Sequence, residues 1–413
     1  MTETLKPENA EQVLDAVQWA AAEKAPLKVV GRGSKDGFGR PVVAPHTLDM
    51  SGLSGIRTYE PNELFMTTGA ATPIAEIEAA LRQNNQQMAF EPSDLGALLG
   101  GAEEAGSIGG AIACNLGGPR RISAGAARDH FLGFNAVSGR GEVFKSGGTV
   151  VKNVTGFDLS KLIAGSFGTL AVMTDVTFKV LPAPEKTRTV LAIGLSAADA
   201  MKAMSVALGS SNEISAAAHL PDAAAAASAV DYVSGNGGTV TAVRLEGPGP
   251  SVEHRCRAVR ALWEEFGCEL EELHSENSRT LWREVRDVGL LKGDGPYDGP
   301  GHQVWRLSVP PMSGAVVAEN LAADLATQVL YDWGGGLVWL AVDAGPDAGA
   351  EQIRRAVAEV GGHATLIRAA EDVRGRVAVF EPQTGALKGL TERVKEGFDP
   401  HGILNPGRMV EGV

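Results

Sequence analysis

The stretch GSFGTLAVMTDVTFKV, Gly165 to Val180, joins a glycine-punctuated turn to a run with the pattern of a β-strand. Within the run, apolar residues alternate with other residues, and the apolar set is Val172, Val176, Phe178 and Val180. A period of two predicts a half-buried strand, with one face in the core and one in solvent. Pro182 and Pro184 end the run, and we place a domain boundary there.

Short helical and strand patterns alternate on the N-terminal side of this boundary. They predict helices over 9–24, 73–81 and 158–164, a strand over 27–30, and a β-hairpin whose strands, 134–137 and 142–144, flank a turn at 138–141.

The region beyond the boundary has a different pattern of predicted secondary structure. Residues 185–380 mix helical patterns such as 252–266 with strand patterns such as 239–245 and 337–342, which indicates an α+β region. Near the C-terminal end, an amphipathic helix is predicted that Asp399-Pro400 ends. Its apolar face consists of Leu387, Leu390, Val394 and Phe398.

Charge and cysteine content exclude several classes of protein. The 413 residues include 50 acidic and 37 basic side chains, a formal net charge of −13, which argues against a nucleic-acid partner. Three isolated cysteines fit a reducing compartment and are too few for an iron–sulfur cluster with four cysteine ligands. Without a signal-peptide pattern or a long apolar run, we expect a cytoplasmic protein that reaches a membrane only through partners.

Four glycine-punctuated segments are candidates for binding phosphate through backbone N–H groups. Each segment alone is also compatible with an ordinary turn, since the first has G-x-G but lacks the third glycine of the dinucleotide fingerprint. The segments are Gly31 to Lys35, Ser107 to Ala111, Gly165 to Leu170 and Asn405 to Arg408.

The order of these segments resembles the FAD-binding domain of the vanillyl-alcohol oxidase and p-cresol methylhydroxylase (PCMH) superfamily. Within that superfamily, three long runs are similar to the FAD-binding E subunits of bacterial glycolate oxidases. The runs are NLGGPRRISAGAARDHFLG (Asn115 to Gly133), VVKNVTGFDLSKLIAGSFGTLAVMTDVTFKVLP (Val150 to Pro182) and FDPHGILNPGRM (Phe398 to Met409).

The resemblance implies an α+β fold in three segments. Residues 1–182 would form a two-subdomain PCMH-type FAD-binding domain, and 183–383 an α+β cap or substrate domain. Residues 384–413 would form a helix and tail that return to the FAD-binding domain.

The same resemblance implies a set of residues around FAD. Gly31, Arg32, Gly33, Ser34 and Lys35 would hold the pyrophosphate through backbone N–H groups. Ser107, Gly109, Gly110, Gly165, Ser166, Gly168, Thr169, Val172 and Asn405 would line the rest of the cofactor. Neither 31–39 nor 106–129 contains the histidine that tethers flavin in many relatives, so we expect non-covalent FAD.

Oxidation of a 2-hydroxy acid requires a cation for the carboxylate and a base for the hydroxyl proton. Arg120 and Arg121 are a basic pair that could meet an FAD phosphate or a substrate carboxylate, or lie in solvent. His363 and Arg368 in the cap are the catalytic candidates, although His363 could equally be structural. The remaining histidines are scattered without metal-ligand spacing, and we predict no metal site.

The resemblance implies the FAD-binding subunit of a glycolate oxidase that converts glycolate to glyoxylate, with a homologous catalytic FAD subunit and an iron–sulfur subunit as partners. Two alternatives remain open at this point. One is a structural or electron-relay subunit without its own turnover, and the other is a stand-alone FAD-dependent 2-hydroxy-acid dehydrogenase.

Overall fold

A computed structural model describes residues 3–149, 156–291, 302–343 and 345–412 of the chain. The chain divides into two compact units. The first unit consists of Met1–Gly117, Gly125–Ala183 and Pro382–Val413, and the second of Gly118–Ala124 and Pro184–Glu381. The assignment of 118–124 to the second unit was not among the predictions from the sequence.

The first unit begins with a helix and a small parallel sheet in the order β1-β3-β2 (Glu3–Leu5, His46–Asp49, Leu27–Val30). Helix α1 (Ala10–Glu23) starts where the Asn9 side chain accepts a hydrogen bond from the backbone N–H of Gln12. The helix ends at Lys24, which adopts the left-handed conformation with φ 50°. The predicted helix and strand over 9–24 and 27–30 are therefore confirmed.

The second part of this unit is a five-stranded antiparallel sheet in the order β4-β5-β9-β7-β8. Its strands are Ile56–Glu60, Phe65–Gly69, Ala171–Lys179, Phe131–Ser138 and Val143–Gly147. Strands β7 and β8 pair across the turn 138–141, which confirms the predicted hairpin. The other regular elements are α2 (Ile74–Arg82), α3 (Ile108–Ala113), α5 (Ala127–His130), α6 (Leu159–Ile163) and the pair β6 (Gln86–Gln87) and β10 (Leu181–Pro182).

The prediction of a half-buried strand was wrong for β9. It is the central strand of its sheet, and side chains on both of its faces are buried. Val172 packs with α1 in one hydrophobic cluster, whereas Met173 and Val176 belong to another. Thr174 and Thr177 can be buried in this strand because each hydroxyl makes a hydrogen bond, Thr174 with the Asn135 carbonyl and Thr177 with the Thr67 hydroxyl.

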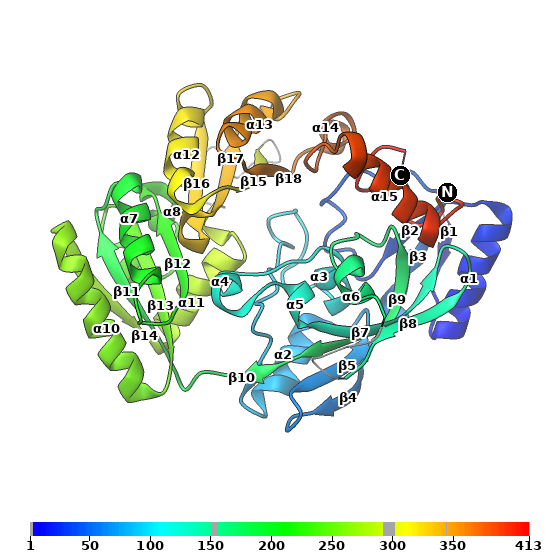
Figure 1. Cartoon of the computed structure of the whole chain (residues 1–413), viewed down its shortest axis with the longest axis horizontal. Coiled ribbons are helices and arrows are strands. Elements are labelled where there is room, and N and C mark those ends of the chain that lie inside the picture. Colours follow the sequence, from blue (N-terminus) through cyan, green and yellow to red (C-terminus); the bar gives the residue numbers. More distant parts are fainter. Residues whose placement is uncertain (1–2, 150–155, 292–301, 344, 413) are drawn as a thin grey trace. The chain divides into compact units, whose positions relative to one another are not determined.

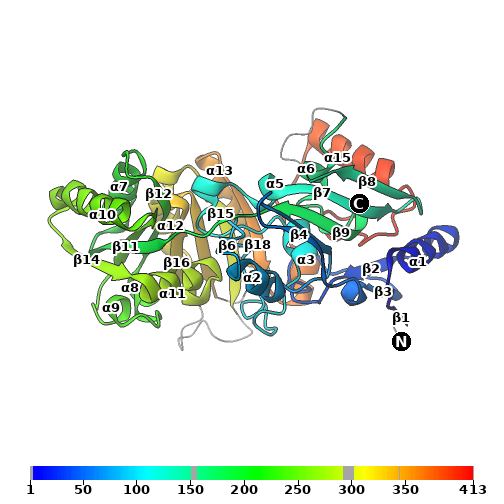
Figure 2. The same ribbon diagram turned by 90° about the horizontal axis from the view of Figure 1, so that it is seen from below.

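Helix α15 (Gly385–Phe398) packs beside the same sheet (Figure 2). Val394 and Phe398 contact its hydrophobic cluster, and the Phe398 ring lies 5.9 Å from that of Phe144. Leu387 and Leu390 are instead 56% and 50% exposed. Among the described residues, only the C-terminal half of the predicted apolar face is therefore packed against other side chains.

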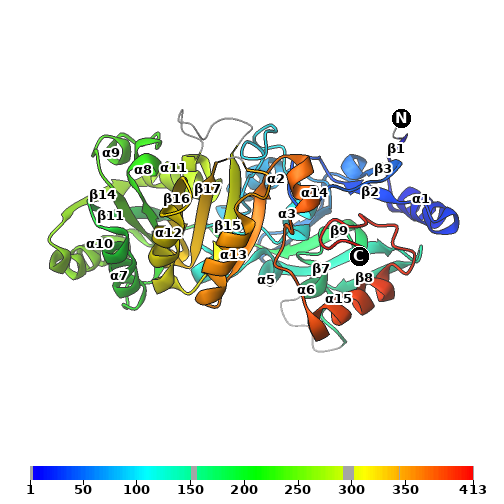
Figure 3. The same cartoon turned by 90° about the horizontal axis from the view of Figure 1, so that it is seen from above.

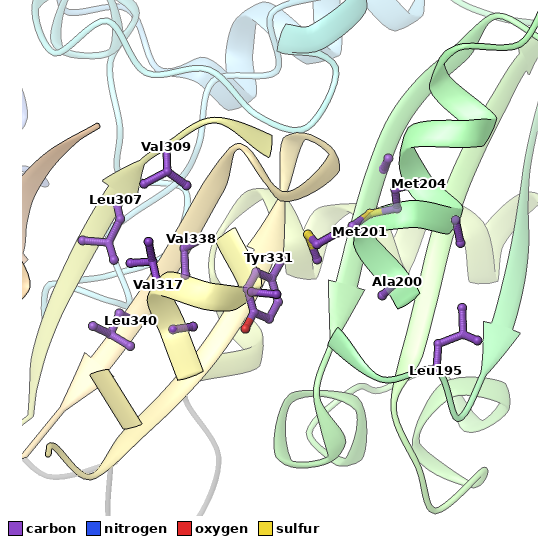
Figure 4. Packing of buried hydrophobic residues seen from close by; sticks show 14 of the residues in the cluster. Leu195, Ala200, Met201, Met204, Leu307, Val309, Val317, Tyr331, Val338 and Leu340 are labelled. Atoms are coloured by element: carbon purple, nitrogen blue, oxygen red, sulfur yellow. The ribbon is translucent and has the colours of Figure 1, made fainter. Parts of the chain in front are cut away.

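The second unit is built on an eight-stranded antiparallel sheet in the order β14-β11-β13-β12-β16-β17-β15-β18. Its strands are Glu269–His274, Lys186–Ile193, Val240–Gly247, Ile214–Leu220, Thr327–Asp332, Leu337–Val342, Gln303–Ser308 and His363–Arg368. Helices α7 (Ala197–Leu208), α10 (Gly249–Trp263), α12 (Gly314–Ala322) and α13 (Ala350–Glu359) share one large hydrophobic cluster with it. Figures 1 and 3 show these helices over the strands, and Figure 4 shows part of the cluster.

The described part of the second unit also contains the helices α4 (Arg121–Ala124), α8 (Asp222–Ala226), α9 (Asp231–Ser234), α11 (Ser275–Arg286) and α14 (Glu371–Arg376). Helix α11 packs on the opposite face of the sheet from the large cluster, where the Trp282 indole N–H donates to the Thr189 hydroxyl at 2.8 Å. None of the helices in the described ranges is both long and apolar enough to cross a bilayer.

Candidate functional site

A cavity of about 860 Å³, including its open mouth, lies within the first unit. Segments that are far apart in the sequence meet around it. The predicted cofactor residues that line it are Gly31, Arg32, Gly33, Ser34, Lys35, Ser107, Gly109, Gly110, Gly168, Val172 and Asn405.

The loop after β2 presents free backbone donors to this cavity. The N–H groups of Gly33, Ser34 and Lys35 donate no hydrogen bond to any described residue, whereas the Gly33 carbonyl accepts from Asp36. Gly33 has φ +75°, a conformation in which L side chains are strained. Successive free N–H groups in such a turn form a concavity that suits an anion.

The Lys35 side chain adds a positive charge to the same cavity. Its ammonium lies 3.2 Å from the Ser34 hydroxyl, which is its one hydrogen-bond partner in the described part of the chain. Burial lowers the pKa of Lys35, while Cys114 and Asp94 oppose that shift. An ammonium that is largely removed from water without a paired carboxylate is stabilised by an anionic ligand.

The second glycine segment brings backbone close to backbone. Ser107 begins α3 by accepting a hydrogen bond from the Gly110 N–H at 3.3 Å. A Cβ at Gly109 would lie 2.5 Å from the Ala70 carbonyl oxygen, and one at Gly31 would lie 2.8 Å from the Ser107 hydroxyl. Glycine at these positions therefore lets the first loop, Gly31 to Lys35, and helix α3 share one wall of the cavity.

Asn405 joins two walls of the cavity. Its Oδ1 accepts from the Val29 N–H at 2.7 Å, and its Nδ2 donates to the Phe167 carbonyl at 2.8 Å. A Cβ at Gly168 would lie 2.9 Å from the same Nδ2. The amide thus holds the end of β2 against the turn before β9, although the two are about 140 residues apart in the sequence.

Arg408 reinforces the first loop and was missing from the predicted site. Its guanidinium lines the cavity and donates to the Lys35 carbonyl at 2.8 Å. It also lies 3.8 Å from the Asp36 carboxylate. Arg408 lies in the run FDPHGILNPGRM, which carries part of the family resemblance, so the sequence pointed to this region. No sequence pattern predicts its hydrogen bond to the Lys35 carbonyl.

A buried ion pair organises the tail that carries these residues. The Lys395 ammonium donates to the Asp399 carboxylate at 2.7 Å and to the carbonyls of Thr169 and Leu404 at 2.8 and 3.0 Å. The Asp399 carboxylate accepts from the N–H groups of Ile403 and Leu404. Burial lowers the pKa of Lys395, and Asp399 opposes the shift.

Several predicted residues lie outside the cavity lining. Gly165, Ser166 and Thr169 belong to the turn beside it, but do not line it. Arg120 lies in the second unit, where its Nε and Nη2 donate to the Glu246 carboxylate at 3.0 and 2.8 Å. Burial alone would raise the pKa of Glu246, but its arginine neighbours outweigh burial and bring the pKa to about 2.

The two catalytic candidates, His363 and Arg368, lie at opposite ends of one strand. His363 begins β18 and is exposed, whereas Arg368 ends the strand and donates through Nε to the His302 carbonyl at 3.1 Å. Five residues of extended chain separate their backbones by roughly 16 Å. The pKa of His363 is lowered by burial and by Arg306 and Arg121, and raised by Glu381.

Comparisons with known proteins bear on the fold and the family. A family model described as an FAD binding domain matches residues 3–147. The chain is 34% identical to the glycolate oxidase subunit GlcE of Escherichia coli (strain K12) over 400 residues, 97% of each chain. It is 40% identical to the glycolate oxidase subunit GlcD of Bacillus subtilis (strain 168) over 87 residues, 21% of this chain and 18% of that protein.

A solved structure of p-cresol methylhydroxylase with substrate bound has the same fold, with a TM-score of 0.67 and 15% sequence identity. That match covers 99% of this chain and 88% of the other. The predicted α+β fold of the PCMH type, the cofactor FAD and the oxidoreductase class are thereby confirmed. The chain belongs to the GlcE family of glycolate oxidase subunits.

Proposed function

We propose that this chain is the FAD-binding subunit of a glycolate oxidase complex, which oxidises glycolate to glyoxylate and passes the electrons to an iron–sulfur subunit. The similarity to GlcE along 97% of both chains is the observation that carries the proposal. The local similarity to GlcD supports a second, homologous FAD subunit as the neighbour in the complex. The complex is cytoplasmic in this proposal, and any membrane association runs through its other subunits.

The cavity in the first unit is the proposed FAD site. The free N–H groups of Gly33 to Lys35 and the Lys35 ammonium hold the pyrophosphate. The close approach of backbone at Gly109 leaves room for the ribityl chain and the flavin beside α3. Bound FAD supplies a hydride acceptor for the carbon that carries the hydroxyl of the substrate.

The flavin is held non-covalently in this proposal. No histidine is among the described residues that line the cavity, and Cys114 is the nucleophilic side chain there. Burial raises the pKa of the Cys114 thiol, although Lys35 and Arg408 lower it. A protonated thiol is a poor nucleophile toward a flavin ring.

The test is to co-express the chain with its neighbouring glycolate oxidase subunits and purify the complex through a tag on this chain. We expect both FAD subunits to carry releasable FAD, and glycolate to bleach the flavin absorbance of the complex. An active complex in which this chain carries no flavin would instead identify it as a structural subunit. Bleaching by glycolate of the isolated chain would identify a stand-alone dehydrogenase.

A further inference from the structure

Arg306 is a half-buried cation of β15 in the second unit. It lies in β15 between Trp305 and Leu307, which point into the large hydrophobic cluster, and therefore faces the other side of the sheet. Its guanidinium makes no hydrogen bond or ion pair with a residue in the described ranges. Since a guanidinium carries five N–H donors, this leaves a strong donor set for a ligand.

The guanidinium of Arg306 is positioned by a cation–π contact with the Trp333 ring. Its guanidinium carbon lies 5.0 Å from the centre of the Trp333 ring, and that of Arg121 lies 4.5 Å from the same ring. Trp333 has a φ of 54°, which is rare for a bulky residue, and its indole N–H donates to the Gly118 carbonyl at 3.2 Å. Backbone strain of this kind is often found at functional sites, where the surrounding structure maintains it, so the conformation of Trp333 suggests a functional role.

The electrostatics around Arg306 favour an anion. Burial and the charge of Arg121 lower the pKa of Arg306 to about 10, and Asp332 raises it. His363 lies in the same field, since both arginines lower its pKa. Arg121, Arg306 and His363 from α4, β15 and β18 thus lie within electrostatic range of one another, and Asp332 and Glu381 are the negative charges that act on them. An anion bound by Arg306 would offset the repulsion between the two arginines.

Two hydroxyl residues are neighbours of Arg306 on the same face of the sheet. Thr365 lies directly opposite Arg306 on β18, so the two side chains share a face, and Ser308 is two residues along β15 on that face. Both are half-buried, and neither hydroxyl has a hydrogen-bond partner among the described residues. A planar cation with hydroxyl residues on the same face matches a carboxylate with a neighbouring hydroxyl.

We propose that Arg306, positioned by Trp333 and supported by Arg121, binds the carboxylate of a small 2-hydroxy acid, with Thr365 and Ser308 hydrogen-bonding the ligand's hydroxyl. The choice of ligand rests on the proposed function. Arg120 takes no part, because its guanidinium is engaged by Glu246. His363 lies opposite Ser308 in the register of β18 and β15, and its lowered pKa favours the neutral imidazole.

Binding of glycolate to the full chain with FAD tests the proposal, measured by saturation-transfer NMR and by tryptophan fluorescence. Arg306→Met should weaken binding by about 10- to 150-fold, the usual range for a hydrogen bond to a charged group. Arg306→Lys should weaken it less because the charge is kept. Arg376→Met is the matched control, since Arg376 is exposed and pairs with Asp372 on α14.

Other probes separate the possible ligands. Glycolamide, which is neutral, should not compete with glycolate, and inorganic phosphate should compete weakly. Wild-type affinity in Arg306→Met, no glycolate binding by the wild type, or tighter binding of phosphate would each overturn the proposal. FAD content and glycolate turnover of the wild-type complex are measured on the same preparations. A wild-type complex that contains no FAD or does not turn over glycolate would count against the proposed function. Unchanged glycolate binding by Arg306→Met, in a complex that is active, would count only against this site.

Discussion

Replacement of Asn405 by alanine should loosen the cavity at the point where two of its walls meet. The side chain is 5% exposed and makes two short hydrogen bonds to backbone, to the Val29 N–H and the Phe167 carbonyl. Alanine removes the hydrogen bond that Asn405 makes with each of these backbone groups. The end of β2 and the turn before β9 then lose the link through this side chain, and the loop Gly31 to Lys35 loses one of its supports.

The size of the effect follows from those two bonds. An unsatisfied buried donor or acceptor costs about 1–3 kcal/mol, and both groups border a cavity that water can enter. We therefore expect Asn405→Ala to lower the free energy of unfolding of the apoprotein by about 2–4 kcal/mol. FAD affinity should fall as well, because the loop that offers its N–H groups to the ligand is less ordered before binding.

Urea unfolding of apoprotein, followed by titration with FAD, measures both effects. Asn405→Asp keeps the acceptor for Val29 but places a carboxylate against the Phe167 carbonyl, so it should be at least as damaging as alanine. His401→Ala is the control on the same tail, because His401 is exposed and a surface change typically stays within about 0.5 kcal/mol. Unfolding and FAD binding of Asn405→Ala that match those of His401→Ala would refute the reasoning.

Three further predictions concern the cofactor loop and the second unit. Lys35→Met should weaken FAD binding by about tenfold or more while leaving riboflavin binding unchanged, since only FAD carries the pyrophosphate; equal losses in calorimetry would place the ammonium elsewhere. Gly33→Val should reduce FAD content, whereas Gly237→Val, which has the same open space and a φ of +68° in the second unit, should not; equal flavin content in both variants would make the Gly33 loop a simple turn. The depressed pKa of Glu246 contributes stability above the ordinary carboxyl pKa of 4.5 that is lost as the pH falls toward about 2, so urea midpoints of Glu246→Gln should depend less on pH across that range than those of the wild type; parallel curves would contradict the ion-pair assignment.

Local signals in the sequence were enough to predict several secondary-structure elements of the first unit. The helix over 9–24 has an Asn cap at its start, an apolar face and a proline after its end, and each of these acts within a few residues. The hairpin at 138–141 is likewise a local feature. Burial of β9 on both faces was missed because its position in the centre of the sheet depends on pairing with β5 and β7.

Long-range pairing also explains the errors at the candidate site. Nothing near Arg120 indicates that Glu246, 126 residues away, would engage its guanidinium. His363 and Arg368 lie at the two ends of one strand, β18. The cavity residues were predicted through the family resemblance, whereas Arg408 and the Lys395–Asp399 pair depend on how the tail returns to the first unit.

The flavin content of the purified chain tests the central claim most directly. Acid precipitation of the wild-type chain should release close to one equivalent of FAD per chain into the supernatant and leave no flavin on the precipitated protein. A folded chain that takes up no FAD even when the cofactor is supplied in excess would contradict the assignment of the cavity.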